Sequence, residues 1–298
     1  MSFKQDCENS MRNKINFIWL SFFMITLPFY LKAHTIIPES FVEEGNYYTG
    51  NVFGRHNYAE HTNVHLESFF IMKKEVTYSL YQQVSAWANN HGYIINNGCN
   101  GAREEDCLTP ETDGGLHPVT NIEWLDTIIF ANALSEMLQL QPVYLMKNAE
   151  PLRASDRNSA IYVNPKATGY RLPGLHEWQV AARGGKPALK SNTYGDLHSG
   201  SNNAKKVAWY PEFDSPHFGT QIVGKLSPNA LGIFDMSGNV SEWVFESYQL
   251  DNTIMYYFCG GSYLSHATTL ASCDSHSSGI TMSDIGFRLV RGSIHEKK

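Results

Sequence analysis

Three stretches of the chain repeat apolar residues with the period of an α-helix. The first covers 76–90, where Thr77 can cap the start and Gly92 follows the end. The second covers 121–140, and the third covers 173–185, which opens on a proline and closes on two glycines. The pattern predicts two amphipathic helices followed by a shorter helix.

Short apolar runs typical of β-strands lie between and around these helices, at 68–74, 142–146, 169–172 and 285–290. The rest of the chain is rich in glycine, asparagine, serine and aromatic residues, which favours turns and irregular structure. No internal repeat, low-complexity tract or linker interrupts it. We therefore expect an α+β fold with much irregular structure, in a single domain over 34–298.

The first 33 residues differ in character from the rest. Arg12 and Lys14 precede a long apolar run that ends near Ala33, a small residue of the kind that signal peptidase requires. This pattern predicts a signal peptide at 1–33 and a periplasmic or secreted protein. Because the apolar run is long for a signal, an uncleaved membrane anchor is the alternative. Met11, just before the basic pair, competes with Met1 as the true start.

Composition and charge exclude some partners. The chain is 42% hydrophobic and 13% aromatic, enough to build a substantial core. Its formal net charge is −6 and it has no long run of either sign. It therefore lacks the basic surface that nucleic acids or anionic membranes attract, and we expect no nucleic-acid partner and no stable membrane insertion beyond the leader.

The cysteines predict disulfides. Cleavage of the leader removes Cys7 and leaves an even number of cysteines in an exported chain. Cys99 and Cys107 close a short polar loop with no histidine at zinc-site spacing, which favours a local bridge over a metal site. Cys259 and Cys273 are the remaining pair, although the sequence alone leaves crossed pairings open.

Five motifs occur in a fixed order, and together they carry a family resemblance. They resemble the sulfatase-modifying-factor family, which includes formylglycine-generating enzymes and bacterial proteins implicated in siderophore tailoring and secretion signalling. The resemblance covers nearly all of the chain after the leader, and it implies a lectin-like α+β domain with little regular secondary structure. The motifs are KKEVTYSLYQQV at 73–84, HPVTNIEWLDTIIFANALSE at 117–136, GYRLPGLHEWQVAARGG at 169–185, PNALGIFDMSGNVSEWV at 228–244, and GGSY at 260–263 followed by IGFRLVRG at 285–292.

Some residues of these motifs are predicted to stabilise the fold and not to take part in a reaction. Arg171 and Glu177 are predicted to form an ion pair under the indole of Trp178, and the Gly184-Gly185 pair lets the chain turn sharply after the helix.

The motif FDMSGNVSEW predicts a structural calcium site. Asp235 and Glu242 supply carboxylate oxygens, while Gly238 and Val240 can supply backbone carbonyls, a mixture that suits Ca²⁺. The resemblance implies a calcium site at these four positions, with asparagine in the family where Asp235 stands here. The alternative is a hydrogen-bonded turn above a buried Trp243. In either case the motif stabilises the fold.

The resemblance also shows where reactive groups are missing. Formylglycine-generating enzymes oxidise a substrate cysteine with O₂, using copper held by two cysteines that follow the GGSY motif. Aligned through that motif, the two positions are Ser265 and Leu270. Neither a hydroxyl nor an isobutyl group replaces a thiolate as a Cu(I) ligand, so formylglycine-generating activity is disfavoured. A rearranged copper site at Cys259 and Cys273 is the alternative to a plain disulfide there.

Other polar residues remain near the GGSY motif. His266 with Asp274 or His276 could form a non-haem iron or general-base site, which leaves the identity of any redox metal open. A separate group, His56, His61 and His65, shows no helix or strand periodicity and is interpreted as a surface loop. The candidate pocket residues near GGSY are Ser262, His266, Asp274, His276 and Arg288, with Tyr263 beside them.

Three functions compete on these observations. The first is an exported family member without copper-thiolate catalysis that acts as a peptide-binding, protein-binding or regulatory module, through the pocket under GGSY and the loops around Trp209, Tyr210 and Trp243. The alternative is an oxidative tailoring enzyme of the siderophore-maturation type, with a redox metal that thiols do not hold. Carbohydrate binding through calcium is disfavoured, because the protein ligands already occupy much of the ion's coordination shell.

Overall fold

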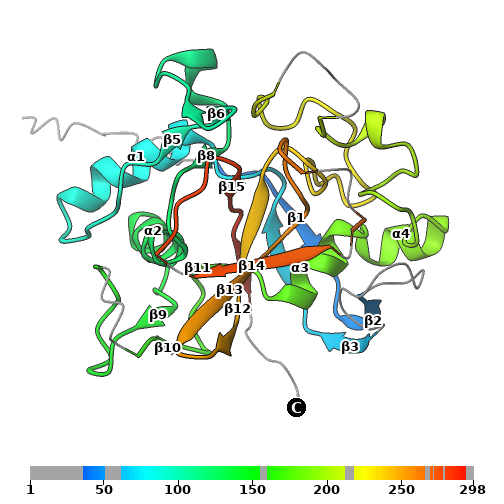
Figure 1. The fold of residues 1–298 in the computed structure, drawn as a ribbon. Coiled ribbons are helices and arrows are strands. Elements are labelled where there is room, and N and C mark those ends of the chain that lie inside the picture. Colours follow the sequence, from blue (N-terminus) through cyan, green and yellow to red (C-terminus); the bar gives the residue numbers. More distant parts are fainter. Residues whose placement is uncertain are drawn as a thin grey trace, which may run out of the picture. The chain divides into compact units, whose positions relative to one another are not determined.

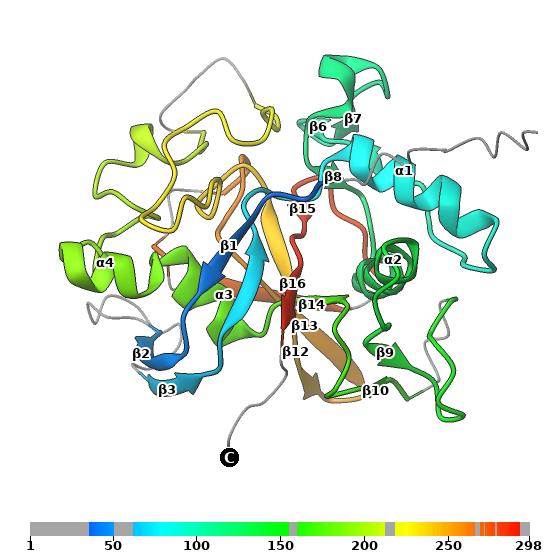
Figure 2. The ribbon, with the colours of Figure 1, turned by 180° about the vertical axis from the view of Figure 1, so that it is seen from behind.

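The structure is a computed structural model that describes residues 36–50, 62–154, 160–211, 218–265, 269–270, 272–277 and 279–292 (Figures 1 and 2). Ile36–Lys298 group as one compact unit. The predicted leader, and with it the question of an uncleaved anchor, lies outside the described residues. Among the helices that are described, none is long and apolar enough to cross a bilayer.

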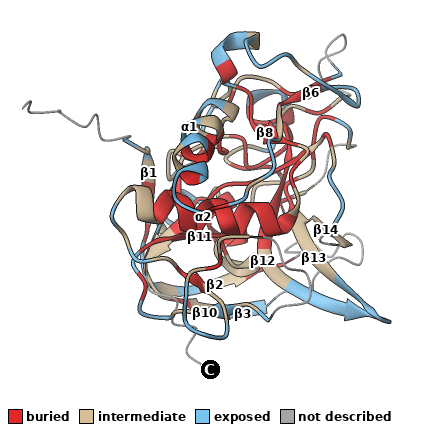
Figure 3. Ribbon diagram, turned by 90° about the vertical axis from the view of Figure 1, so that its left-hand side faces the viewer, coloured by how far each residue is buried: buried red, intermediate tan, exposed pale blue. Residues whose placement is uncertain are grey.

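Helix α2 (Trp124–Met137) is the second predicted helix, and it lies at the centre of the fold. Its first turn is capped by Asp126, whose carboxylate accepts a hydrogen bond from Glu123 N at 3.1 Å. Every residue from Trp124 to Ser135 is buried (Figure 3). The expectation of one apolar face is therefore wrong for this helix, because neighbouring elements cover it on all sides.

The other predicted helices also form. Helix α1 (Tyr78–Asn89) starts after Thr77, whose hydroxyl accepts a hydrogen bond from Leu80 N at 3.2 Å. Helix α3 (Leu175–Ala182) ends before two glycines, and a helix that the sequence did not predict, α4 (Gly185–Ser191), follows at once. The 3-10 helices are η1 (Thr112–Gly115) and η2 (Ala204–Lys206).

The described strands include two four-stranded sheets, which lie between α1 and α2 on one side and α3 and α4 on the other (Figures 1 and 2). The first has the order β1-β4-β16-β11 and the second β14-β13-β12-β15, while the remaining strands form two-stranded pairs. The bounds are β1 Glu39–Val42, β2 Gly45–Thr49, β3 Thr62–Leu66, β4 Phe69–Met72, β5 Cys99–Asn100, β6 Ala102–Arg103, β7 Asp106–Cys107, β8 Val119–Thr120, β9 Tyr144–Leu145, β10 Tyr162–Val163, β11 Tyr170–Arg171, β12 Ser241–Leu250, β13 Thr253–Cys259, β14 Cys273–Ser277, β15 Ile285–Gly286 and β16 Val290–Gly292.

The predicted strand at 285–290 is divided between these sheets. Its start is β15, which pairs in parallel with β12. Its end contributes to β16, which pairs with β4 and β11 in the other sheet. The residues between them, 287–289, are buried, so this apolar segment connects the two sheets through the core instead of forming one strand.

The longest strands, β12 and β13, form a hairpin that the sequence did not predict. They are joined at Asp251-Asn252, where Asp251 has a positive φ of 52°. A two-residue Asp-Asn turn between two strand-forming runs is a hairpin signal, whereas the sequence predicts only a calcium site or a hydrogen-bonded turn at the FDMSGNVSEW motif, where β12 begins. The hairpin is buried near Glu242 and exposed at its tip (Figure 3).

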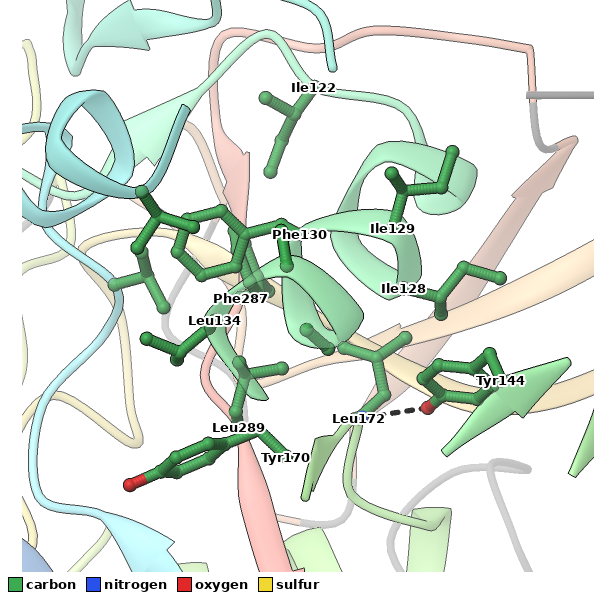
Figure 4. Packing of buried hydrophobic residues seen from close by; sticks show 14 of the residues in the cluster. Ile122, Ile128, Ile129, Phe130, Leu134, Tyr144, Tyr170, Leu172, Phe287 and Leu289 are labelled. Atoms are coloured by element: carbon green, nitrogen blue, oxygen red, sulfur yellow. Dashed lines mark hydrogen bonds between the residues drawn. The ribbon is translucent and has the colours of Figure 1, made fainter. Parts of the chain in front are cut away.

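Two apolar clusters form the core. The larger surrounds α2, where the ring of Phe130 meets Phe287 edge-on, with ring centroids 5.3 Å apart (Figure 4). Phe130 also stacks on Tyr81, with centroids 5.0 Å apart. In the same cluster the Tyr144 hydroxyl accepts a hydrogen bond from Leu172 N at 2.9 Å. The second cluster contains Trp178, Cys259 and Leu270, and it lies beneath the GGSY segment.

Candidate functional site

The GGSY segment, Gly260–Tyr263, begins where β13 ends. Gly260 has a φ of +100°, and a Cβ placed there would lie 3.2 Å from the Trp178 ring, so glycine is required on both counts. Ser262 and Tyr263 are buried. The Tyr263 hydroxyl donates a hydrogen bond to the carbonyl of Glu104, and burial raises the Tyr263 pKa to about 12. The segment is therefore fixed to the turn between β6 and β7.

The two family cysteine positions have structural roles in this chain. The Ser265 hydroxyl accepts a hydrogen bond from Ser262 N at 3.1 Å and lies 3.1 Å from the Ser262 hydroxyl. Ser262 in turn donates to Asp284 Oδ2 at 2.6 Å. Leu270 is 2% exposed and packs in the second core cluster. One position now closes a hydrogen-bonded turn, and the other fills the core.

The described cysteines form two disulfides, Cys99–Cys107 and Cys259–Cys273. Both predicted pairs are confirmed, and the crossed pairings left open by the sequence do not occur. The alternative of a copper site at Cys259 and Cys273 is wrong, because their sulfurs bond to each other. Within the described residues, no free thiol lies near the GGSY segment.

The predicted pocket residues on β14 do not converge. Asp274 is exposed and its carboxylate accepts from Ser275 N at 2.7 Å, while His276 Nδ1 accepts from Ser277 N at 2.9 Å. His266, their proposed partner, lies outside the described residues. Among the residues that are described, neither Asp274 nor His276 belongs to a group of three side chains with metal-binding geometry.

Arg288, placed in the same pocket by sequence proximity, is fully buried. Its Nε donates to Glu242 Oε2 and its Nη2 donates to Glu242 Oε1, both at 2.7 Å. The remaining donors reach the carbonyls of Met72 and Phe234. Arg288 thus belongs to the interior and offers no group to a solvent-facing pocket, which corrects the prediction. The predicted Arg171–Glu177 pair does form, with N–O distances of 2.6 and 2.7 Å.

A cluster of buried carboxylates surrounds Arg288. Glu75 and Asp235 are 2% and 4% exposed, and Glu242 is fully buried, so three carboxyl groups share one guanidinium. Burial raises the pKa of Asp235 to about 6, and burial together with the nearby Asp235 and Glu242 raises the pKa of Glu75. No described residue donates a hydrogen bond to Glu75 Oε1 or to Asp235 Oδ1.

These two oxygens bear on the predicted calcium site. Both Glu242 oxygens already accept from nitrogen donors, since Oε2 also receives the Trp178 indole N–H at 2.8 Å. Asp235 Oδ1, in contrast, is a hard oxygen without a described donor in a region of excess negative charge, which is what Ca²⁺ requires. Of the predicted side-chain ligands, Asp235 is therefore the one best able to bind calcium. The complete site at Asp235, Gly238, Val240 and Glu242 stays a prediction. Gly238 cannot be replaced, because a Cβ there would lie 2.5 Å from the Trp209 carbonyl oxygen.

The raised Asp235 pKa gives a testable pH dependence for chelator-treated protein. The folded chain holds this proton more tightly than the unfolded chain, whose carboxyl titrates near 3.8. Protonation of Asp235 therefore stabilises the folded chain at low pH, and this contribution to the free energy of unfolding is lost as the pH rises from about 4 to about 7. The loss is about 2–3 kcal/mol, because each unit of pKa difference between the folded and unfolded chain corresponds to about 1.36 kcal/mol. Urea unfolding at about pH 4 and about pH 7 measures this loss in the wild type. Asp235→Asn is the comparison, because its side chain does not titrate.

Adding calcium distinguishes stabilisation by a bound metal ion from stabilisation by protonation of Asp235. At about pH 7 added Ca²⁺ is expected to raise the stability of the wild type and not that of Asp235→Ala, which has no side-chain oxygen at this position. An equal response of both proteins to calcium contradicts the predicted site.

A polar cavity that the sequence did not predict lies beside the GGSY segment. Its volume is about 130 Å³. Inside it the Thr220 hydroxyl is 2.9 Å from His117 Nδ1, and His117 Nε2 is 2.9 Å from Asp113 Oδ2. Asn239 links the cavity to the segment, because its side chain accepts from Gln221 N and its carbonyl accepts from Tyr263 N. The lining residues are Ala102, Arg103, Leu108, Thr112, Asp113, His117, Gly219, Thr220 and Gln221.

Little in the sequence indicated these missed residues. Glu75 and His117 both lie in the family motifs, but Glu75 directly follows Lys73 and Lys74, a run of charge that is typical of a solvated surface. His117 stands immediately before the proline of HPVTN. Nothing local to Thr220 or Asp113 indicated that both would hydrogen-bond to His117.

Comparison with known proteins identifies the family. The model of the sulfatase-modifying factor enzyme 1-like domain matches residues 31–293. The chain therefore belongs to this family, that of the formylglycine-generating enzymes.

Three known proteins illustrate the relationship. The crystal structure of CarF is 51% identical in sequence, with a TM-score of 0.81, and the match covers 87% of this chain and 99% of that one. Treponema denticola variable protein 1 has 26% identity and a TM-score of 0.68 over 85% of this chain and 94% of its own. The chaperone protein LppX of Paenibacillus barcinonensis is 32% identical over 62% of this chain, and the match spans 64% of its own length.

Proposed function

We propose that this chain is an exported binding module of its family, without copper-thiolate catalysis, that holds a peptide or protein partner. The polar cavity beside the GGSY segment carries the proposal. The segment that positions two reactive thiols in formylglycine-generating enzymes here ends in a hydrogen-bonded serine and a core leucine. The adjoining cavity is a concave feature beside it, among the residues that the structure describes.

The cavity suits one polar side chain of a bound peptide. At about 130 Å³ it is close to the size of a cavity of about 150 Å³ that holds benzene. Its lining offers the Arg103 guanidinium, the Asp113 carboxylate and the Gln221 amide. Arg103 and Asp113 are exposed and Gln221 is partly buried, so these groups stand at an open mouth, whereas His117 and Thr220 are buried inside. A few polar groups placed around a concave site orient a bound side chain and favour one with matching donors and acceptors.

Two further observations support the proposal. Disulfides form in oxidising compartments, so the two bridges favour a periplasmic or secreted location. LppX is named as a chaperone protein, and the similarity of this chain to it favours a protein or peptide partner.

Filling the cavity is expected to abolish peptide binding. Peptides selected from a displayed random library against the purified chain should bind the wild type and lose at least ~10-fold in affinity for Leu108→Trp, since about 1.4 kcal/mol corresponds to that factor. Leu116→Trp is the matched control, because Leu116 is 46% exposed and does not line the cavity. Isothermal titration calorimetry measures both affinities.

Three results would contradict the proposal. The first is equal peptide affinity of the two tryptophan variants. The second is aldehyde formation on a Cys-x-Pro-x-Arg peptide, which would restore the formylglycine-generating reaction. The third is stoichiometric iron or copper in the purified protein, lost in His266→Ala, which would favour the oxidative tailoring enzyme.

A further inference from the structure

The β2–β3 hairpin gathers four polar side chains on one face. Strands β2 and β3 lie side by side (Figure 2), and their register pairs Gly45 with Leu66 and Asn46 with His65. Continued by one residue, the same register sets Glu44 opposite Glu67. Side chains alternate between the faces of a strand, and Leu66 is buried in the second core cluster. Glu44, Asn46, His65 and Glu67 therefore share the outer face.

Three of these side chains have metal-binding geometry. One ligand atom each from Glu44, His65 and Glu67 lies within 4.8 Å of the others, the one such group among the described residues. His65, interpreted from sequence as part of a surface loop, lies instead in β3, while His56 and His61 lie outside the described residues. The strand pairing brings together groups that are over twenty positions apart.

The hydrogen bonds of His65 point to a cation at this place. His65 Nδ1 lies 2.8 Å from Asn46 Oδ1, which is an acceptor, so Nδ1 carries the proton. In neutral imidazole Nε2 then carries a lone pair, and it faces Glu44 Oε1 at 3.3 Å. Two acceptors at that distance need a cation between them, either a second proton on His65 or a metal ion.

We propose that Glu44, His65 and Glu67 bind a divalent transition-metal ion of the Zn²⁺ type. One imidazole nitrogen and two carboxylate oxygens provide three ligands of a tetrahedron and leave the fourth to solvent. The side chains of His65 and Glu44 are 34% and 53% exposed, so the site is open to the medium. Asn46 is a positioning residue, because it fixes the tautomer that presents Nε2. This site is separate from the peptide-binding cavity and from the calcium prediction.

The test uses the full chain, stripped with EDTA and then saturated with Ca²⁺ so that oxygen-only sites are filled. We expect Zn²⁺ to bind with one-to-one stoichiometry by titration calorimetry, and Co²⁺ to give visible d–d absorption bands. His65→Ala and Glu67→Gln should each remove those bands. Asn46→Ala should keep them and weaken Zn²⁺ binding by ~10-fold, as loss of a supporting hydrogen bond does at metal sites.

Control variants separate this site from chance binding. His91→Ala removes an exposed histidine whose Nδ1 lies 2.7 Å from the Trp87 carbonyl, and it should leave Zn²⁺ binding unchanged. Leu108→Trp should also leave it unchanged, so that failure of the cavity proposal and failure of the metal proposal are distinguishable. Binding that persists in His65→Ala and Glu67→Gln, with native melting temperatures, indicates an adventitious ion only and overturns the proposal, as does the absence of stoichiometric binding.

Discussion

Replacing Arg288 by methionine is expected to lower the free energy of unfolding by about 3–5 kcal/mol, because removal of one partner of a buried ion pair leaves an uncompensated charge. Arg288 is fully buried and is the cation at the centre of Glu75, Asp235 and Glu242. Its loss also frees the carbonyls of Met72 and Phe234 from their hydrogen bonds. Urea unfolding followed by circular dichroism measures the change.

Two further variants test the origin of this effect. Arg288→Lys keeps the charge and loses the two-point contact with Glu242, so its loss should be intermediate. Lys186→Met breaks a half-exposed pair with Glu43 and should change stability by about 1 kcal/mol or less. If Arg288→Met proves as stable as Lys186→Met, the carboxylate cluster is neutralised by something other than this arginine.

Asn132→Ala is expected to cost at least about 3 kcal/mol, because it leaves backbone groups without partners at about 1–3 kcal/mol each. Asn132 is fully buried in α2, and its Oδ1 accepts from Val143 N and Tyr144 N at 3.1 and 3.0 Å. Its Nδ2 donates to the carbonyls of Tyr144 and Leu152 at 2.6 and 3.1 Å. One amide side chain thus ties the central helix to β9 and to the segment after it.

The matched control is Asn164→Ala. Asn164 makes a local side-chain contact, with its Oδ1 accepting from Lys166 N at 3.1 Å, and solvent can replace it. Its replacement should cost about 1 kcal/mol or less. Thermal unfolding of both variants at one pH compares their losses of stability. Equal losses would show that the hydrogen bonds of the buried Asn132 amide do not stabilise the fold.

Local patterns predicted the parts of the fold that local forces determine. The Thr77 cap and the apolar spacing after it predicted α1 correctly, because capping and helical periodicity act over a few residues. Cysteine count and spacing predicted both disulfides. The sequence was wrong about α2 as an amphipathic helix, since its polar residues, such as Asn132, are satisfied by backbone groups from another part of the chain.

The candidate site was harder to predict, because its contacts join distant parts of the chain. Glu75 and Asp235 are neighbours in space and 160 positions apart, and no local period records that. Arg288 was assigned to the GGSY pocket because it follows the motif, whereas the direction of its side chain depends on which sheet its segment joins. The lack of cysteines after the GGSY motif could be predicted, because the spacing from that motif gives the two positions that cysteines occupy in formylglycine-generating enzymes.

The burial of Leu270 has a consequence for redesign of the chain. Cysteine at this position would remove volume from a packed interior and cost stability, while the Ser265 hydroxyl would still close its turn. A single Leu270→Cys substitution is therefore expected to weaken the chain without creating a pair of thiols. A designed pair of thiols would need a second substitution at Ser265 and larger side chains around residue 270 to refill the interior.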